Sequence, residues 1–227
     1  DGKGQVRVES IADAEQIPWS DCEAWIAERC IEFDLEVSVV VARTVEGKQV
    51  AFPVFENSHR NHILDVTVTP ASIPESVANQ AERIAFAASE AIDVVGLLCV
   101  EFFVRGDQVM INEVAPRPHN SGHLSIEACE TSQFEQHVRA ICNLPLGSTS
   151  LRSGASAMAN LLGDLWAGDG TPPNWERVFQ DPSISLHLYG KRSAKRGRKM
   201  GHLTSTGSSV DSVRRAVLES RDRLQQP

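Results

Sequence analysis

At 227 residues the chain can bury a core in one large domain, or in one domain with a small appendage. Its 41% hydrophobic and 23% charged residues are ordinary for a folded protein of mixed helix and strand, and they exclude a disordered or fibrous chain. The formal net charge of −8 argues against nucleic acid as a partner, because such a surface needs clustered Lys and Arg. An odd number of cysteines, no membrane-length apolar run and no signal peptide indicate a cytoplasmic protein without a membrane partner.

The first part of the chain predicts loops and strands that end in a hairpin. Polar, glycine-spaced residues 1–5 lead into an alternating segment, residues 6–9, that is typical of a strand. Residues 21–27 predict a short helix. The β-branched run within residues 31–43 and the segment 49–54 are typical of strands, and the turn between them predicts a hairpin.

The middle of the chain predicts a long helix and a second hairpin. Residues 72–93 carry an apolar stripe at helical spacing, and Ser72 and Glu75 are spaced as a capping box at its start. A buried-looking strand at 97–104 is followed by a tight turn and a return strand at 108–114. These two strands predict an antiparallel pair.

The last part of the chain predicts a small appendage of strands and helix. An amphipathic pattern predicts a helix at residues 131–142, and it is followed by a stop signal. Short strands are predicted at 155–162, 183–189 and 201–204, with a closing helix at 210–224. We therefore expect an α+β protein with a larger domain, residues 1–148, and a small C-terminal α+β domain, residues 149–227.

Two glutamates of the second predicted hairpin face each other. Glu101 interrupts an apolar strand and Glu113 lies on the return strand, so the tight turn places both side chains on one face. Like charges roughly 5 Å apart repel, and apolar neighbours add a desolvation cost, so a cation is needed to offset both. Mg²⁺ fits, because it takes one or two carboxylates and completes its shell with water and phosphate oxygens. Two ordinary acids on a solvated strand face remain the alternative.

Polar residues crowd the loop that follows Glu113. Arg117 can stabilise negative charge, and His119 and Asn120 offer hydrogen bonds and proton transfer to a substrate amine. A structural turn is equally compatible with this pattern. Basic residues also concentrate at 191–199, which indicates either a site for an anion or a solvated charge run.

Several segments resemble the 5-(carboxyamino)imidazole ribonucleotide synthetases, a family of the ATP-grasp superfamily. The segments read DGKGQ, ERCIEFDLEVSVVVAR, PVFENSHRNHILD, NEVAPRPHNSGH with the later ETSQFEQHVRAICNLPLG, and YGKRSAKRGRKMGH. Together they extend over nearly the whole chain. The resemblance implies an ATP-grasp fold, with antiparallel sheets and flanking helices, for residues 1–148, and the family's small C-terminal domain after it.

The resemblance also implies roles for individual residues. The expected ATP contacts are Asp1, Gly2, Lys3, Gly4, Gln5, Glu28, Ile31, Glu36, His59, Asn112 and Glu113. Glu101 and Glu113 would hold Mg²⁺. The expected catalytic residues, which would line the place where the carboxyl donor meets aminoimidazole ribonucleotide, are Arg117, His119 and Asn120. Lys191 and Arg198 would bind the phosphate of that ribonucleotide.

The implied activity is ATP-dependent carboxylation of 5-aminoimidazole ribonucleotide with bicarbonate, through carboxyphosphate, in purine biosynthesis. ATP and Mg²⁺ would be the cofactors, and the family suggests a homodimer. The sequence has no counterpart of the family's N-terminal domain or of the first half of its glycine loop, so we expect a fragment. A non-catalytic nucleotide-binding module is one alternative. A formate- or biotin-directed ATP-grasp ligase is another, although PRPHNSGH and GKRSAKRGRKMGH argue against it.

Overall fold

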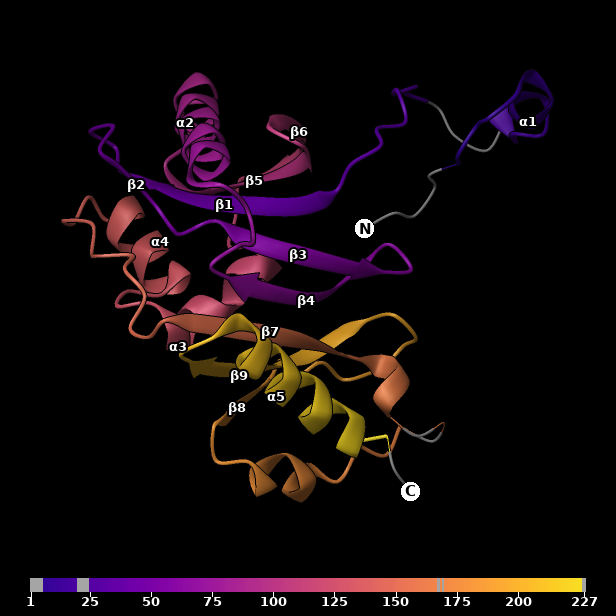
Figure 1. The fold of residues 1–227 in the computed structure, drawn as a ribbon, viewed down its shortest axis with the longest axis vertical. Helices are drawn as coiled ribbons and strands as arrows, with labels where there is room; N and C mark the ends of the chain where they lie inside the picture. The colour runs from indigo at the N-terminus through magenta and orange to yellow at the C-terminus, as the bar shows by residue number, and fades with distance from the viewer. Residues whose placement is uncertain (1–5, 20–24, 167, 169, 226–227) are drawn as a thin grey trace.

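The protein is built on one antiparallel sheet, and the structure, a computed structural model, describes residues 6–19, 25–166, 168 and 170–225. The strand order is β6-β5-β1-β3-β4-β7-β9-β8, with β2 beside β1 (Figure 1). The strands are β1 Leu35–Arg43, β2 Gln49–Ala51, β3 Phe55–Arg60, β4 Ile63–Thr69, β5 Gly96–Arg105, β6 Gln108–Ala115, β7 Ala155–Leu162, β8 Ile184–Leu188 and β9 Lys199–Gly207.

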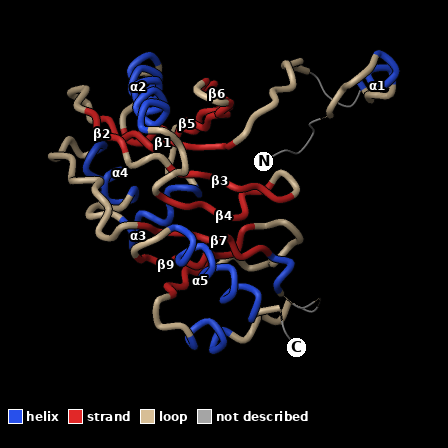
Figure 2. Tube along the Cα trace, in the orientation of Figure 1, coloured by secondary structure: helices blue, strands red, loops and turns tan. Residues whose placement is uncertain are grey.

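Helices cover both ends of this sheet, as Figure 2 shows. The α-helices are α1 Ile11–Glu15, α2 Glu75–Ala91, α3 Ser125–Ala128, α4 Gln133–Ile141 and α5 Val210–Arg223. Short 3-10 helices are η2 Asn120–Leu124, η3 Gly163–Leu165 and η4 Trp175–Gln180. This content confirms the predicted α+β class. Within the described residues, no helix is both long and apolar enough to cross a membrane.

The side-chain alternation of β1 and β5 builds two separate cores. Val39 and Phe102 face α2 and pack in one cluster with its Ala81. Leu97 lies on the opposite side and packs with Leu124 and other residues near α3. Because successive side chains of a strand point to opposite faces, the polar residues of the second face lie on the side of η2 and α3.

Most of the predicted elements are confirmed within a few residues. The β1–β2 and β5–β6 pairs are the two predicted hairpins, and α2, α4 and α5 are the predicted helices. The three C-terminal strands are β7, β8 and β9. The capping box is wrong: Pro74 is the N-cap of α2, and the Ser72 backbone N–H donates to the Glu56 carboxylate instead.

The N-terminal predictions hold less well. Residues 6–9 form no strand, because Val6 and Val8 are exposed and no described strand lies against them. The helix predicted at 21–27 lies partly outside the described residues, and Trp25 to Ala27 are not helical. Helix α1 is not expected from the sequence pattern.

The β3–β4 hairpin is also absent from the sequence prediction. Its turn residues, Asn61 and His62, have φ values of 51° and 61°. Two positive φ values are the mark of the tight hairpin turn that usually carries a glycine. Because neither turn residue is a glycine, the sequence pattern does not predict this chain reversal.

The sheet continues across the predicted domain boundary near residue 148. Strand β4 pairs with β7, with Val66 opposite Ala159. Val66 also packs in one cluster with Leu203 of β9 and Val217 of α5. The two-domain division therefore stays a prediction, and its two parts share one sheet.

Candidate active site

The two glutamates of the β5–β6 hairpin lie directly opposite each other, as the sequence predicts. The register shifts immediately afterwards, with Phe102 opposite Ile111, so Asn112 is the extra residue of a β-bulge. Glu101 is partly buried, whereas Asn112 and Glu113 are exposed on the end strand of the sheet. The pair therefore opens to solvent at this edge.

The carboxyl group of Glu101 is ionised at neutral pH. Its burial raises the pKa, but a hydrogen bond from His119 and the charges of His119 and His59 outweigh the burial. The net effect is a pKa below the usual value for a glutamate. A half-buried, ionised carboxylate beside a second one is a suitable place for a cation.

A buried hydrogen-bond chain fixes the ring of His119. The Ser121 backbone N–H points at His119 Nδ1 over 3.3 Å, and because it can only donate, Nδ1 is the acceptor. The Ser121 hydroxyl lies 2.8 Å from the same nitrogen and accepts from Ser38 at 2.9 Å. Asn57 in turn donates to Ser38 at 2.9 Å. The proton of the neutral ring therefore lies on Nε2, which is 2.9 Å from Glu101 Oε1.

The backbone of His119 is held by a buried glutamine of α4. The His119 N–H donates to Gln133 Oε1 at 2.9 Å, and Gln133 Nε2 donates to the His119 carbonyl at 2.7 Å. Gly122 lies against the same side chain, where an added Cβ would come within 2.6 Å of Gln133 Oε1. The loop thus has both a fixed ring and a fixed backbone.

The predicted nucleotide contacts are only partly brought together. His59 of β3 pairs with Glu36 of β1 through its Nδ1. Glu28 is exposed and Ile31 is partly buried, both in the irregular segment before β1. Asp1, Gly2, Lys3, Gly4 and Gln5 lie outside the described residues. The ATP roles of all these residues stay predictions.

The two predicted phosphate ligands lie together in the loop between β8 and β9. Lys191 donates to the Lys199 carbonyl at 2.6 Å, and Arg198 donates to Ser193 through its carbonyl and hydroxyl at 2.9 and 3.0 Å. Burial lowers the pKa of Lys191, and the charge of Arg198 lowers it further. Two neighbouring cations that disfavour each other suit an anionic ligand.

Lys199 is a site residue that the sequence pattern misses. It begins β9, and burial is the main cause that lowers its pKa. The charges of Glu101 and Glu113 oppose this, while those of Arg117 and Lys191 add to it. Lys199 therefore lies within electrostatic range of both the carboxylate pair and the exposed Arg117. In the sequence only its place beside Arg198, in a run of cations, marks it.

An aromatic cluster, which the sequence analysis also misses, lies beside this site. His187 and His202 stack with ring centroids 4.5 Å apart, and His123 is 5.3 Å from His202. The Tyr189 hydroxyl is 2.8 Å from His202 Nδ1, and His187 Nε2 is 2.6 Å from the Glu127 carboxylate. The cluster packs C-terminal strands against the loop that carries His119.

The cluster predicts that the protein loses stability in acid. Burial is the main cause that lowers the pKa of His123 from 6.5 to about 4 and that of His202 to about 3. The unfolded chain binds these protons near pH 6.5 and the folded chain does not. The free energy of unfolding should therefore fall between pH 6.5 and about 4, by up to about 1.4 kcal/mol per pH unit for each histidine.

The measurement is urea unfolding at a series of pH values. Replacing His202 by Asn should make the acid slope shallower, whereas the same change at exposed His62 should leave it unaltered. His187 acts in the opposite sense, because its hydrogen bond to Glu127 raises its pKa. The contribution of His187 to the free energy of unfolding is complete in acid, and it is lost as the pH rises through the pKa of His187 in the folded protein. A slope unaffected by His202→Asn would contradict the assignment.

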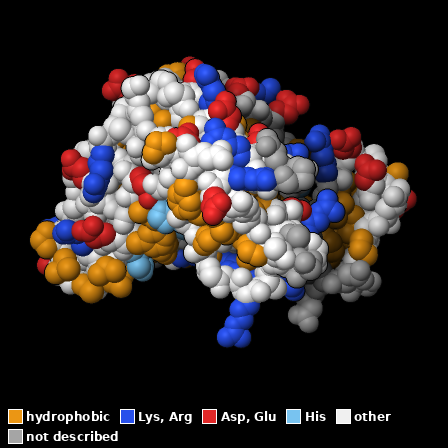
Figure 3. Space-filling model, turned by 90° about the horizontal axis from the view of Figure 1, so that it is seen from below, with side chains coloured by type: hydrophobic (Ala, Val, Ile, Leu, Met, Phe, Trp, Pro, Cys, Tyr) orange, Lys and Arg blue, Asp and Glu red, His pale blue; other side chains and the backbone are white. Residues whose placement is uncertain are grey.

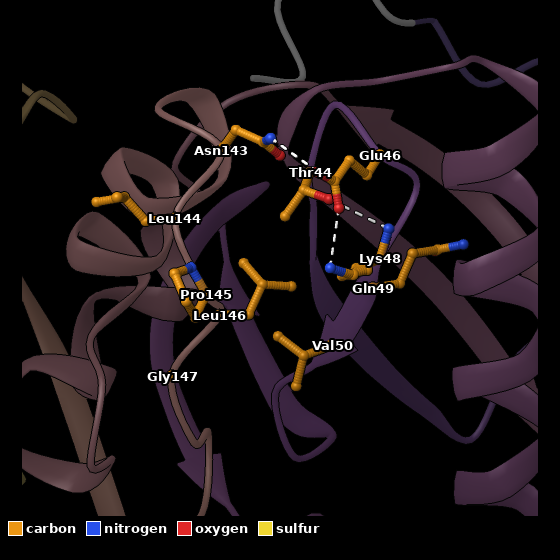
Figure 4. Close-up of a pocket in the computed structure, with 10 residues that line it drawn as sticks. All are labelled: Thr44, Glu46, Lys48, Gln49, Val50, Asn143, Leu144, Pro145, Leu146 and Gly147. Carbon is orange, nitrogen blue, oxygen red and sulfur yellow. Dashed lines mark hydrogen bonds and ion pairs between the residues drawn. The ribbon is translucent and has the colours of Figure 1, made fainter.

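Other surface features lie away from this site. A hollow of about 440 Å³ lies between the β1–β2 turn and the loop after α4 (Figure 4). Its charged groups are already paired, since Glu46 contacts both Lys48 and Asn143. Figure 3 shows hydrophobic side chains at the lower left edge, in the centre and at the right of the face seen from below, with both signs of charge among them. None of the predicted site residues lines the hollow.

Comparison with known proteins matches both parts of the chain. The ATP-grasp domain family matches residues 1–134, and the phosphoribosylaminoimidazole carboxylase C-terminal domain matches residues 156–216. The N5-carboxyaminoimidazole ribonucleotide synthase of Bacillus subtilis is 41% identical over 90% of the chain and 53% of its own length. The chain thus spans about half the length of this relative.

Solved structures agree with the fold. An N5-carboxyaminoimidazole ribonucleotide synthetase in complex with ADP matches with a TM-score of 0.80 and 40% identity, over 99% of this chain and 59% of its own. The synthase of Aspergillus clavatus, in complex with ADP and 5-aminoimidazole ribonucleotide, matches with a TM-score of 0.75 and 33% identity, over 84% and 52%. The chain therefore belongs to the ATP-grasp family, in the branch that carries the phosphoribosylaminoimidazole carboxylase C-terminal domain.

Proposed function

We propose that the complete protein uses ATP to carboxylate the amine of 5-aminoimidazole ribonucleotide with bicarbonate. Bicarbonate takes the terminal phosphoryl group of ATP and gives carboxyphosphate and ADP. The amine then attacks the carboxyl carbon, forms the N–C bond, and releases phosphate and a proton. The observation that carries this proposal is that the two opposed glutamates, His119 and Lys199 come together at one site in a chain of this family.

Glu101 and Glu113 are the residues that would hold Mg²⁺. Their oxygen atoms suit a hard cation, and Glu101 is ionised at neutral pH. The described residues contain no cluster of three or more His, Cys, Asp or Glu side chains that could ligate a metal. Two carboxylates alone match Mg²⁺, which fills its remaining positions with water and phosphate oxygens. When bound, the ion would neutralise charge on the phosphates of ATP.

The loop residues and Lys199 would hold the carboxyl donor beside the amine. His119 directs the proton on its Nε2 at Glu101 Oε1, so it would orient the carboxylate that holds Mg²⁺ beside the carboxyl donor. Arg117 and Lys199 supply positive charge near the same place. Positioning matters here because carboxyphosphate must meet the amine before it meets water.

The second substrate would be anchored by its phosphate. Arg198 lies close enough to Lys191 for its charge to lower the pKa of that lysine, and both side chains are exposed. Charge-assisted hydrogen bonds to phosphate are the strong class of hydrogen bond, and the planar fork of arginine suits this group. A homodimer and a cytoplasmic location stay predictions.

Isotope incorporation tests the proposal with the full-length protein. With ATP, [¹³C]bicarbonate and 5-aminoimidazole ribonucleotide, we expect labelled carboxylated product and one ADP per product. ADP release should need both the bicarbonate and the ribonucleotide. Nucleotide binding without ADP release would favour the non-catalytic module instead, and ADP release with another acceptor in place of the ribonucleotide would favour a different ATP-grasp ligase.

A further inference from the structure

A buried asparagine of β7 holds Asn120 through both ends of its side chain. Asn160 is fully buried and lies on the C-terminal part of the sheet. Asn120 Nδ2 donates to Asn160 Oδ1 at 3.0 Å, and Asn160 Nδ2 donates back to Asn120 Oδ1 at 2.6 Å. Forty residues separate the two in sequence. This reciprocal pair is a direct bond between the His119 loop and the C-terminal strands.

A third contact settles which way the Asn160 amide points. Its Nδ2 also donates to the carbonyl of Leu64 on β4, at 2.8 Å. A backbone carbonyl can only accept, so the atom that faces it must be the nitrogen. The two hydrogens of Nδ2 are then shared between Leu64 and Asn120, and Oδ1 is left to accept from Asn120. Asn160 has one orientation, and it dictates the orientation of Asn120.

The strand that carries Asn160 is itself anchored. Arg221 of α5 is buried and donates to the Asn160 carbonyl at 3.3 Å. The same guanidinium binds both carboxylate oxygens of Asp65, the residue after Leu64, at 2.5 and 3.2 Å. A bidentate ion pair of this kind is rigid. Strand β4 therefore binds the side chain of Asn160, and helix α5 binds its carbonyl group.

The Asn120 side chain also lies near Tyr189, the residue that precedes the basic loop. Burial raises the pKa of the Tyr189 hydroxyl, and the Asn120 side chain opposes this rise. Since Asn120 directly follows His119, a shift of Asn120 moves the ring that faces Glu101.

We propose that Asn160 is a positioning residue that acts through Asn120 to place the His119 loop for carboxyl transfer. The inference rests on the proposed function, and it gives the C-terminal strands a second task besides binding phosphate. Asn160 touches no reacting group. Its effect on turnover depends on the presence of the Asn120 side chain, which accepts one hydrogen bond from Asn160 and donates one to it.

A double-mutant cycle on the full chain tests this directly. Asn160→Ala and Asn120→Ala should each lower kcat by about 10- to 100-fold, because misplacement near 1 Å costs about that much, while the KM for ATP stays within about twofold. The double variant should be no slower than the slower single variant, because both changes remove one interaction. If the two losses in kcat instead multiplied in the double variant, Asn160 would act independently of Asn120, and the proposal would be overturned.

Controls separate positioning from loss of stability and from failure of the proposed function. Ser156→Ala, at another buried polar position of β7, should leave kcat unchanged. When it is combined with Asn120→Ala, kcat should equal that of Asn120→Ala alone. Asn160→Thr keeps a donor for Leu64 and serves if Asn160→Ala does not fold. The ¹⁵N and ¹H signals of the His119 ring should shift in Asn160→Ala and stay in place in Ser156→Ala. An unmoved ring overturns the proposal, even if the wild type proves to catalyse another reaction.

Discussion

Replacing Glu113 by Gln should lower ADP formation by at least about 100-fold in the full-length protein. Loss of a residue that only supports a metal ligand costs about 10- to 100-fold, so loss of a charged ligand should cost at least the upper end. The fold should survive, because Glu113 is exposed on an end strand and the change removes no core volume. Steady-state ADP release at saturating substrates, across a range of Mg²⁺ concentrations, measures the effect.

A matched variant makes this result specific to the hairpin. Glu90→Gln removes the same charge from an exposed position on α2 and should leave turnover unchanged. Circular dichroism and urea unfolding should show both variants folded like the wild type. Near-normal turnover of Glu113→Gln at saturating Mg²⁺ would show that the two glutamates are ordinary surface acids and do not hold the metal ion.

The sequence brings Glu101 and Glu113 near each other because that much of the information is local. A tight turn at Gly106, with a φ of 55°, joins two strongly patterned strands, and counting residues away from the turn places Glu101 opposite Asn112, so the exact pairing with Glu113 needs a register shift. The bulge at Asn112 does not follow in this way. It adds one unpaired residue without any change in composition, and it alters which face the following side chains reach.

The support of His119 and Asn120 could not be predicted from the sequence. Ser38 lies 83 residues before Ser121, and Asn160 lies 40 residues after Asn120. Each is a polar residue in a largely apolar stretch of its strand, and the sequence pattern does not show what it would bond to. Their partners become visible only when β1, β3, β4 and β7 lie side by side, and the order of these strands depends on the β3–β4 turn that lacks a glycine signal.

The basic segment at residues 191–199, between β8 and β9, is the part of the site whose role most needs an experimental test. The sequence offers a run of like charges, whereas in the structure Lys191 lies within electrostatic range of Arg198, and the neighbouring Lys199 lies within range of the carboxylate pair. The loop therefore has cations in two settings. Lys199 lies near the proposed phosphoryl chemistry, and the outer pair, Lys191 and Arg198, lies further from it. Only the outer pair should respond to the ribonucleotide phosphate.

Replacing Arg198 by Ala should raise the KM for 5-aminoimidazole ribonucleotide by roughly 10- to 100-fold. One charge-assisted hydrogen bond is typically about 1.5–3 kcal/mol, which corresponds to that range. The KM for ATP should hardly change, because Arg198 is held by Ser193 in the loop between β8 and β9, away from the predicted nucleotide pair Glu36 and His59. Initial rates with each substrate varied in turn provide the measurement.

The same loop supplies the control for this prediction. Arg196 is an exposed arginine two residues earlier, and it pairs with Asp164 at 3.5 Å. Arg196→Ala removes the same charge from the loop and should leave both KM values unchanged, because an exposed pair contributes little. If Arg196→Ala matched Arg198→Ala, the effect would come from the general charge of the loop, and a rise in the KM for ATP alone would place Arg198 at the nucleotide instead of at the ribonucleotide phosphate.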